Sequence, residues 1–284
     1  FNAGHHIRMY ECAQYVRQNF PDCKIDCLDA SSLNVTWMDF GRKVYKPYDI
    51  ICIYCDYDTS DNLYRQLLYI RELNKKSKIL FFGRLVSVIP AYFEKFTPDA
   101  MIVSGDYEAG IEDYILYLYH RSNSCKGLRF LDKQKKYIQG CEGAYLSVDK
   151  IVFPDIHEIP FERYYELYRT DANRFCGIPN KKELVVPLTR GCPIGCSYCE
   201  IHIQQGNKER RRSVEDTIKY IEDSFRLFDF DYVTFYSANF TYDKIWVKEF
   251  CEKIRGKNIA WKCTTSVKFL TKDLFELLSN SGCF

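Results

Sequence analysis

Two kinds of hydrophobic pattern alternate along residues 7–119. Short continuous apolar runs, typical of strands buried on both faces of a sheet, are separated by stretches with apolar residues at helical spacing. The predicted strands are Lys24–Leu28, Asp49–Tyr54, Lys78–Phe82 and Ala100–Val103, and the predicted helices are Ile7–Asn19, Asp61–Asn74 and Ala109–Tyr119. This alternation predicts an α/β domain built on a doubly wound parallel sheet.

A second series of strands and helices begins at Glu183. Its predicted strands are Glu183–Leu188, Asp231–Tyr236 and Ile259–Thr264, and its predicted helices are Ser213–Phe228, Lys244–Arg255 and Thr271–Ser279. Ser213 is a candidate N-cap, with Asp216 three residues later as in a capping box. This series predicts the first part of a β/α barrel.

The segment between the two series follows neither pattern. Gly127–Gly140 alternates and predicts a hairpin, whereas 141–182 holds prolines among aromatic residues and predicts a packed linker. We therefore predict an N-terminal Rossmann-type domain at 1–140, a linker at 141–182 and the barrel part at 183–284. A complete barrel takes about 250 residues, so we expect the chain to be an excerpt of a longer protein.

Composition narrows the class of protein. Acidic and basic residues nearly balance at a net charge of +2, which predicts no nucleic-acid or anionic-membrane partner. No apolar run approaches the roughly 20 residues of a membrane span. The 14 cysteines are scattered over a long chain, which favours a reduced, cytoplasmic protein with some cysteines as metal ligands.

Three cysteines, Cys192, Cys196 and Cys199, fall within eight positions after the predicted strand at Glu183–Leu188. Gly191 and Gly195 allow the backbone to wrap closely around a bulky ligand. Thiolates select iron–sulfur clusters, zinc or copper. Three cysteines would hold three irons of a 4Fe-4S cluster and leave the fourth open for a cofactor or substrate.

A zinc site is the alternative for this loop. His202 follows Cys199 by three positions, so it and the three cysteines could form a tetrahedral zinc site, as in a zinc-binding module. Zinc motifs usually consist of two separated pairs of ligands, which favours the cluster.

The spacing of three and then two intervening residues, with an aromatic residue before the last cysteine, resembles the radical S-adenosylmethionine (SAM) superfamily. The resemblance implies that the open iron chelates SAM and that the reduced cluster cleaves it to a 5′-deoxyadenosyl radical. It also implies that Tyr198 lies beside the adenine. Asn239-Phe240-Thr241 matches a strand-and-loop motif of the family, which implies a SAM contact at Asn239.

Polar or glycine-containing loops follow three predicted strands of the N-terminal series, at Asp56–Asp61, Gly83–Val86 and Ser104–Glu108. Ligands of open parallel sheets lie at this carboxyl edge. The segments around Gly83 and from Pro98 to Glu108 resemble the cobalamin-binding domain that precedes one large group of radical SAM domains. The resemblance implies cobalamin contacts at Asp56, Tyr57, Thr59, Gly83, Arg84, Ser104, Gly105 and Glu108.

One departure from the family concerns this edge. Arg84 stands where the family usually has a second glycine. The family also lacks the cobalt-ligating histidine motif of other cobalamin enzymes, so His5 and His6 are not assigned as cobalt ligands.

The resemblance implies a cobalamin-dependent radical SAM methyltransferase that acts on an unactivated carbon. It implies a small-molecule or peptide substrate and an electron donor such as flavodoxin or ferredoxin. Arg84 favours the alternative of a radical SAM enzyme with an empty or non-methylating cobalamin domain, which would catalyse a cyclisation or rearrangement. A methylthiotransferase is a further alternative; it would need three more cluster cysteines, for which Cys12, Cys52 or Cys55, and Cys125 are candidates.

Overall fold

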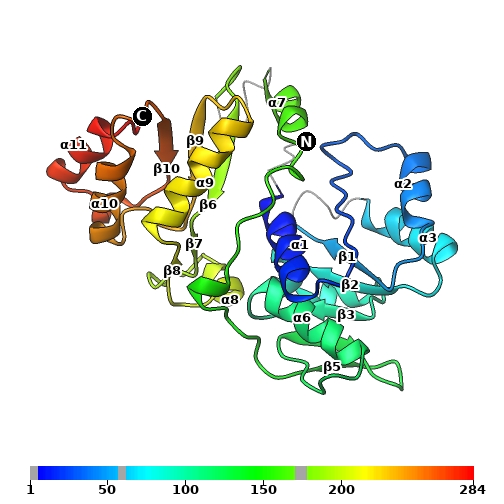
Figure 1. Ribbon diagram of the computed structural model, residues 1–284. Helices are drawn as coiled ribbons and strands as arrows, with labels where there is room; N and C mark the ends of the chain where they lie inside the picture. Colours follow the sequence, from blue (N-terminus) through cyan, green and yellow to red (C-terminus); the bar gives the residue numbers. More distant parts are fainter. Residues whose placement is uncertain (1–5, 57–61, 170–177) are drawn as a thin grey trace.

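The computed structural model describes residues 6–56, 62–169 and 178–284, which form two α/β units side by side (Figure 1). One unit is built on a five-stranded sheet and the other on a three-stranded sheet. Helix α1 (Ile7–Asn19) lies between them, since its Ile7 and Tyr10 pack into the core of the second unit and its Tyr15 and Val16 into that of the first. The fold class predicted from the hydrophobic pattern is confirmed.

The first sheet has the strand order β1-β2-β3-β4-β5. The strands are β1 (Ile50–Tyr54), β2 (Lys78–Phe82), β3 (Ala100–Ile102), β4 (Leu128–Leu131) and β5 (Tyr137–Gln139). Strands β1, β2 and β3 are parallel, and the hairpin β4–β5 extends the sheet with antiparallel pairs. The predicted hairpin is therefore confirmed, and its strand β5 forms one edge of the sheet.

Alternate side chains of the central strands enter two separate cores. On β2, Leu80 and Phe82 face the core formed with α1 and α6 (Tyr107–Leu118), while Ile79 and Phe81 face the other core. Four helices cover that second face: α2 (Trp37–Val44), α3 (Leu63–Leu73), α4 (Arg84–Val88) and α5 (Pro90–Glu94). Burial on both faces explains why these strands are continuous apolar runs.

Some expectations were wrong. Lys24–Leu28 forms no strand: it contains two charged residues and pairs with no strand among the described residues, and its Ile25 carbonyl accepts a hydrogen bond from Arg17 instead. The pattern also missed α2, α4, α5, α7 (Phe161–Tyr168) and α8 (Ile201–Gln205). Each has only five to eight residues, too few to show a helical period.

The segment between the two sheets is packed rather than free. Leu146 and Ile151 join the first core, whereas Ile156, Ile159 and Phe161 join the second. A 3₁₀ turn at Val148–Lys150 and α7 are its regular elements in the described residues. We keep the division into 1–140, 141–182 and 183–284 as a proposal.

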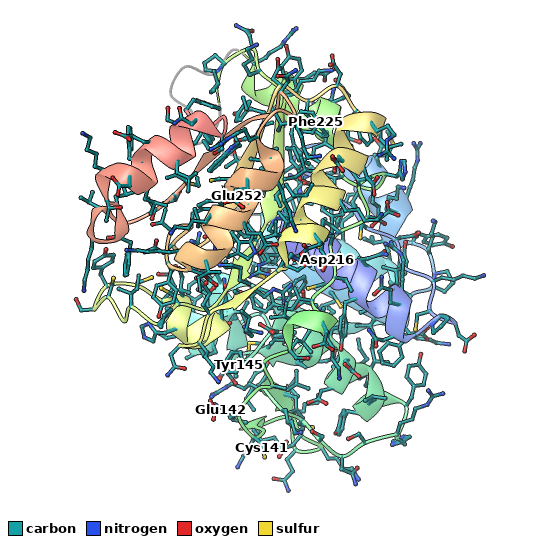
Figure 2. The ribbon with its side chains drawn as sticks, turned by 60° about the vertical axis from the view of Figure 1, so that its left-hand side comes forward. Cys141, Glu142, Tyr145, Asp216, Phe225 and Glu252 are labelled. Carbon is teal, nitrogen blue, oxygen red and sulfur yellow. The ribbon has the colours of Figure 1, made fainter. Side chains whose placement is uncertain are left out.

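The second sheet has the order β10-β9-β6, and all its pairs are parallel. Its elements are β6 (Glu183–Pro187), α9 (Val214–Leu227), β9 (Tyr232–Tyr236), α10 (Lys244–Ile254), β10 (Ala260–Cys263) and α11 (Lys272–Asn280). Ser213 caps α9 by accepting a hydrogen bond from the amide of Asp216 at 3.0 Å, as predicted (Figure 2).

Aromatic side chains fill the core of the second unit. Trp246 and Phe250 of α10 stack with ring centroids 5.1 Å apart, and both contact Phe240, which also lies against Trp261. The core fixes the sheet and thereby the loops at its carboxyl edge. In the described ranges, no helix has the length and apolar character needed to span a membrane.

Candidate functional site

The cysteine loop is a hairpin at the carboxyl end of β6. Strand β7 (Thr189–Arg190) pairs in antiparallel fashion with β8 (Arg210–Arg211), and the loop 191–209 with its short helix α8 projects from this ladder. The ladder therefore fixes the two ends of the loop against each other.

Two glycines shape the loop for different reasons. Gly191 has a φ of +75°, and a Cβ there would overlap the carbonyl oxygen of Lys208 and approach that of Gln205 to 2.9 Å. Gly195 has a φ of +65°, and a Cβ there would have no atom within 4 Å. Gly191 is thus required by close packing as well as by conformation, and Gly195 by conformation alone.

The three cysteines of the loop are free and half-buried. The amide of Cys199 donates to the carbonyl of Cys196 at 3.1 Å, and the amide of Cys192 donates to Gly206 at 3.2 Å, so backbone hydrogen bonds hold both ends of the trio. Three accessible thiols on one glycine-shaped loop fit an iron–sulfur cluster, whose irons each take one thiolate.

The zinc alternative receives no support from the geometry. Among the described residues, no three Cys, His, Asp or Glu side chains converge closely enough to hold one metal ion. A tetrahedral site built from the cysteine trio and His202 would require such a convergence. The thiolates of a cube-shaped cluster lie farther apart than ligands of a single metal ion, because each binds a separate iron of the cube.

The two residues expected at SAM lie in different surroundings. Tyr198 is 88% exposed, between the last two cysteines. Asn239 is buried beyond the carboxyl end of β9, where its side-chain oxygen accepts a hydrogen bond from Thr265 at 2.7 Å. Its backbone carbonyl accepts one from Arg211 of β8 at 3.1 Å, so Asn239 lies beside the base of the cysteine hairpin. Their contacts with SAM remain predictions.

The first two loops of the N-terminal unit come together at the carboxyl edge of its sheet. Gly83 has a φ of +122°, and a Cβ there would overlap the backbone of Cys55. The Nε of Arg84 donates to Asp56 at 3.0 Å, and Asp56 also accepts from the hydroxyl of Tyr54 at 3.1 Å. Tyr57 and Thr59, also expected here, lie outside the described residues.

The third loop is occupied by contacts within the protein. Ser104 accepts a hydrogen bond from the amide of Gly143 at 3.0 Å, and a Cβ on Gly105 would come within 2.7 Å of Ala144. Glu108 is buried and accepts from Nη1 of Arg190 at 2.8 Å. The structure thus places these three residues against the linker and the second unit, and their contacts with cobalamin remain predictions.

A buried ionic network joins the two units below the cysteine loop. Glu11 of α1 is fully buried and contacts three arginines: Arg8 at 2.9 Å, Arg190 at 3.2 Å and Arg212 at 2.8 Å. Burial alone would raise the pKa of Glu11, but the charges of Arg190, Arg8 and Arg212 outweigh it and lower this pKa to about 2. Sequence reasoning missed the network, since 201 positions separate Glu11 from Arg212.

Aromatic side chains gather at the carboxyl end of the first sheet. Tyr54, Phe82 and Tyr107 form edge contacts with centroids 5.3–6.4 Å apart at the end of the first sheet. Burial raises the pKa of Tyr54 well above its ordinary value, and the nearby charges of Asp56, Tyr107 and Tyr236 add to the effect. Beyond the carboxyl ends of the two sheets, the ion pair of Arg84 with Glu200 joins the loops of the two units.

The linker also contacts the cysteine loop. The ring of Tyr145 lies 5.3 Å from the guanidinium of Arg210, and a Cβ on Gly206 would touch the same ring (Figure 2). Arg210 in turn donates to Asp106 at 3.0 Å and to the carbonyl of Leu146 at 2.9 Å. The end of the loop is therefore fixed by both the linker and the first unit.

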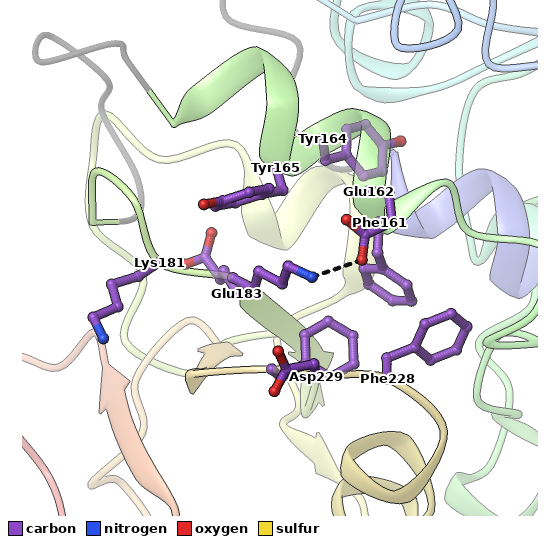
Figure 3. Close-up of a pocket in the computed structure, with 10 residues that line it drawn as sticks. Phe161, Glu162, Tyr164, Tyr165, Lys181, Glu183, Phe228 and Asp229 are labelled. Carbon is purple, nitrogen blue, oxygen red and sulfur yellow. Dashed lines mark hydrogen bonds and ion pairs between the residues drawn. The ribbon is translucent and has the colours of Figure 1, made fainter.

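A small cavity lies elsewhere, at the amino end of β6 (Figure 3). It is lined by α7 and by the residues at the amino ends of β6 and β9, and Lys182 donates to Glu162 across it at 2.9 Å. Its volume of about 10 Å³ is enough for roughly one water molecule. It lies at the opposite end of β6 from the cysteine loop and takes no part in the candidate site.

Comparisons with known proteins agree with this geometry. Residues 186–284 match the family model of the radical SAM superfamily, which confirms the resemblance carried by the cysteine spacing. An uncharacterized methyltransferase of Pyrococcus horikoshii is 23% identical over 279 residues, covering 95% of this chain and 57% of the relative. Cytidylyl-2-hydroxyethylphosphonate methyltransferase of Streptomyces wedmorensis is 24% identical over 140 residues, covering 49% of this chain and 26% of the relative.

Solved structures share the fold at low identity. The cobalamin-dependent SAM radical enzyme OxsB, with aqua-cobalamin and SAM bound, has a TM-score of 0.78 at 16% identity and covers 98% of this chain. The radical SAM methyltransferase TsrM of Kitasatospora setae, with cobalamin and a 4Fe-4S cluster bound, has a TM-score of 0.73 at 12% identity and covers 97%. The chain spans 40% and 54% of these two proteins and about half the length of its curated relatives or less.

Proposed function

We propose, from the radical SAM domain at residues 186–284, that this chain carries the cofactor-binding part of a cobalamin-dependent radical SAM methyltransferase. The substrate is a small molecule or peptide that is methylated at an unactivated carbon. The observation that carries the proposal is that the cysteine hairpin is attached directly to the carboxyl edge of the N-terminal sheet. Arg84 of that edge lies 3.5 Å from Glu200, the residue after Cys199.

Each part of the chain has a task in this proposal. Cys192, Cys196 and Cys199 hold the cluster, and Tyr198 and Asn239 contact SAM. When bound, the cluster supplies an electron for SAM cleavage and the corrinoid supplies a methyl group. The contact of Arg84 with Glu200 and the buried network around Glu11 support an arrangement in which the two proposed sites are adjacent and the two units have a fixed orientation.

The proposal includes the cellular compartment and the electron donor of the enzyme. Thiolate ligands need reduced cysteines, so we propose a cytoplasmic setting with flavodoxin or ferredoxin as electron donor. All 13 cysteines in the described ranges are free thiols.

A second candidate is a radical SAM enzyme whose N-terminal unit holds no corrinoid or uses it for a cyclisation or rearrangement. The ion pair between Arg84 and Asp56 favours it, because this pair occupies the edge where the family usually has a small residue. The methylthiotransferase alternative is not favoured. Cys12 and Cys55 are buried in the two separate cores of the first unit, so they do not lie around one site.

The proposal is tested by the absorption spectrum and the iron content of the full-length protein. The protein is purified without oxygen, reconstituted with iron, sulfide and hydroxocobalamin, and desalted. We expect about four irons per chain, as for one cluster, and about one retained cobalamin. Cys196→Ala should lose the iron, while Cys141→Ala, at an exposed cysteine outside the loop, should keep it.

The alternatives give different results. Iron without retained cobalamin would favour the second candidate, and about eight irons per chain would favour a methylthiotransferase with two clusters. Zinc in place of iron would contradict the radical SAM proposal.

A further inference from the structure

In the part of the chain that the structure describes, ion pairs attach the cysteine loop to the N-terminal unit near each of its ends and in the middle. Before the loop, Arg190 pairs with Glu108, and after it, Arg210 pairs with Asp106. In the middle, Arg84 reaches Glu200. The loop is thus joined to the first unit at three places, although it belongs to the second.

The pairs at the two ends are rigid. All four side chains are at most 11% exposed, and both arginines make two hydrogen bonds to their carboxylate. Breaking a buried pair of this kind is costly, because the remaining charge has no water to solvate it. These pairs therefore fix β7 and β8 but leave open how the middle of the loop is oriented.

The middle of the loop has few other supports before Glu200; directly after Glu200, the short helix α8 lies against α4 of the first unit. A Cβ on Gly195 would have no neighbour within 4 Å, and Pro193, Ile194 and Ser197 are exposed. The segment from Cys196 to Glu200 belongs to no strand ladder. Within the described residues, Glu200 forms the ion pair that joins this segment to the N-terminal unit. Its partner is Arg84.

Arg84 is itself held in one orientation. Its Nε and Nη2 lie 3.0 and 2.9 Å from the same oxygen of Asp56, whose other oxygen accepts from Tyr54. Gly83, directly before it, packs against the backbone of Cys55. The third nitrogen of the guanidinium, Nη1, is therefore directed by the first sheet toward Glu200.

We propose that Arg84 is a positioning residue: acting through Glu200, it sets the orientation of Cys199 relative to the carboxyl edge of the first sheet. This inference rests on the proposed function, because it assigns the cysteine loop to a cluster. It gives a role to the residue by which this chain departs from the family's second glycine.

The test uses Arg84→Gln, Glu200→Gln and the double variant in the full-length, reconstituted protein. SAM is titrated into the reduced protein while the electron paramagnetic resonance spectrum is recorded. Because both partners are about one third exposed, we expect each single variant to weaken SAM binding only about two- to fivefold, as for a pair near the surface. Iron content should stay at the wild-type level, and the SAM-bound signal should be shifted or broadened.

The double variant separates positioning from unrelated damage. If both residues act through their contact, the double variant should resemble either single variant, whereas independent effects add. Arg129→Gln is the matched control, since Arg129 pairs with Glu94 in the same unit at 27% and 29% exposure and away from the loop. It should give the wild-type titration.

Amide hydrogen exchange of the metal-free protein gives a second readout. Arg84→Gln and Glu200→Gln should speed exchange in residues 196–206 and leave Arg210 and Arg211 protected. The inference would be overturned if Arg84→Gln and Glu200→Gln both had the spectra, the SAM affinity and the exchange rates of the wild type. A wild-type protein that assembles no cluster would instead overturn the proposed function, and the exchange measurement would still decide the role of Arg84.

Discussion

Glu11→Gln is the substitution that most directly tests the junction between the two units. It keeps the shape of the side chain but removes the one carboxylate shared by Arg8, Arg190 and Arg212. Three guanidinium groups, all at most 12% exposed, would then lose their common counter-charge. We expect a large loss of stability and a loosening of the junction beneath the cysteine loop.

The magnitude follows from two separate arguments. The three arginines lower the pKa of Glu11 from an ordinary 4.5 to about 2. At about 1.4 kcal/mol per pKa unit, this corresponds to about 3 kcal/mol of stability. Removing one partner from a buried ion pair costs about 3–5 kcal/mol, which agrees.

The assay is urea unfolding, followed by the fluorescence of the three tryptophans and by circular dichroism. Glu11→Gln should lower the free energy of unfolding by about 3 kcal/mol or more. Glu215→Gln, at an exposed pair with Lys253, is the control and should leave it close to the wild-type value, because solvent screens the pair. A Glu11→Gln protein as stable as the control would refute the reasoning.

The difference in stability between the wild type and Glu11→Gln should also depend on pH. Because the folded-state pKa of Glu11 is depressed, its contribution is fully present above about pH 4.5 and is lost as the pH falls toward 2. The stability difference between wild type and Glu11→Gln should therefore shrink with acidification over this window. A difference that grew at low pH would contradict the sign of the shift.

Three further predictions concern the cysteine loop and its surroundings. Gly191→Ala should abolish iron incorporation, because its Cβ would overlap the Lys208 carbonyl, whereas Gly195→Ala should retain iron at a conformational cost of about 1–2 kcal/mol; equal iron contents would contradict this. Ser213→Ala should lower the free energy of unfolding by about 1 kcal/mol through loss of the α9 cap. A change below about 0.3 kcal/mol would show that the cap does not contribute to stability. Asn239→Ala should weaken SAM binding about tenfold or more in a titration at unchanged iron content, as for the loss of a polar contact to a charged ligand, and an unchanged affinity would remove Asn239 from the site.

Features that depend on neighbouring residues in the chain were predictable from the sequence. β2 was predicted with its observed bounds, because the apolar run 79–82 fits only a strand buried on both faces. The cysteine loop was predictable for the same reason, since its ligands and glycines lie within nine positions. The prediction of a strand at Lys24–Leu28 was wrong because a strand also needs a partner strand. The sequence of one segment does not show whether another strand is available to pair with it.

Features that depend on distant pairing were not predictable. The sequence showed Arg84 as a departure from the family, but its partner Glu200 lies on the other unit, 116 positions away. Glu11 resembled any helix carboxylate until the fold brought three arginines around it. Ion pairs between domains leave no periodic signal, so they appear only once the two sheets have been placed.

The central claim is that Cys192, Cys196 and Cys199 hold a cluster with one iron open to SAM. It is tested most directly by the electron paramagnetic resonance spectrum of the reduced protein, recorded without and with SAM. We predict the signal of one reduced 4Fe-4S cluster whose g values change when SAM is added, and no such signal in Cys199→Ala. A cluster signal that SAM leaves unchanged, or one that persists in Cys199→Ala, would contradict the account.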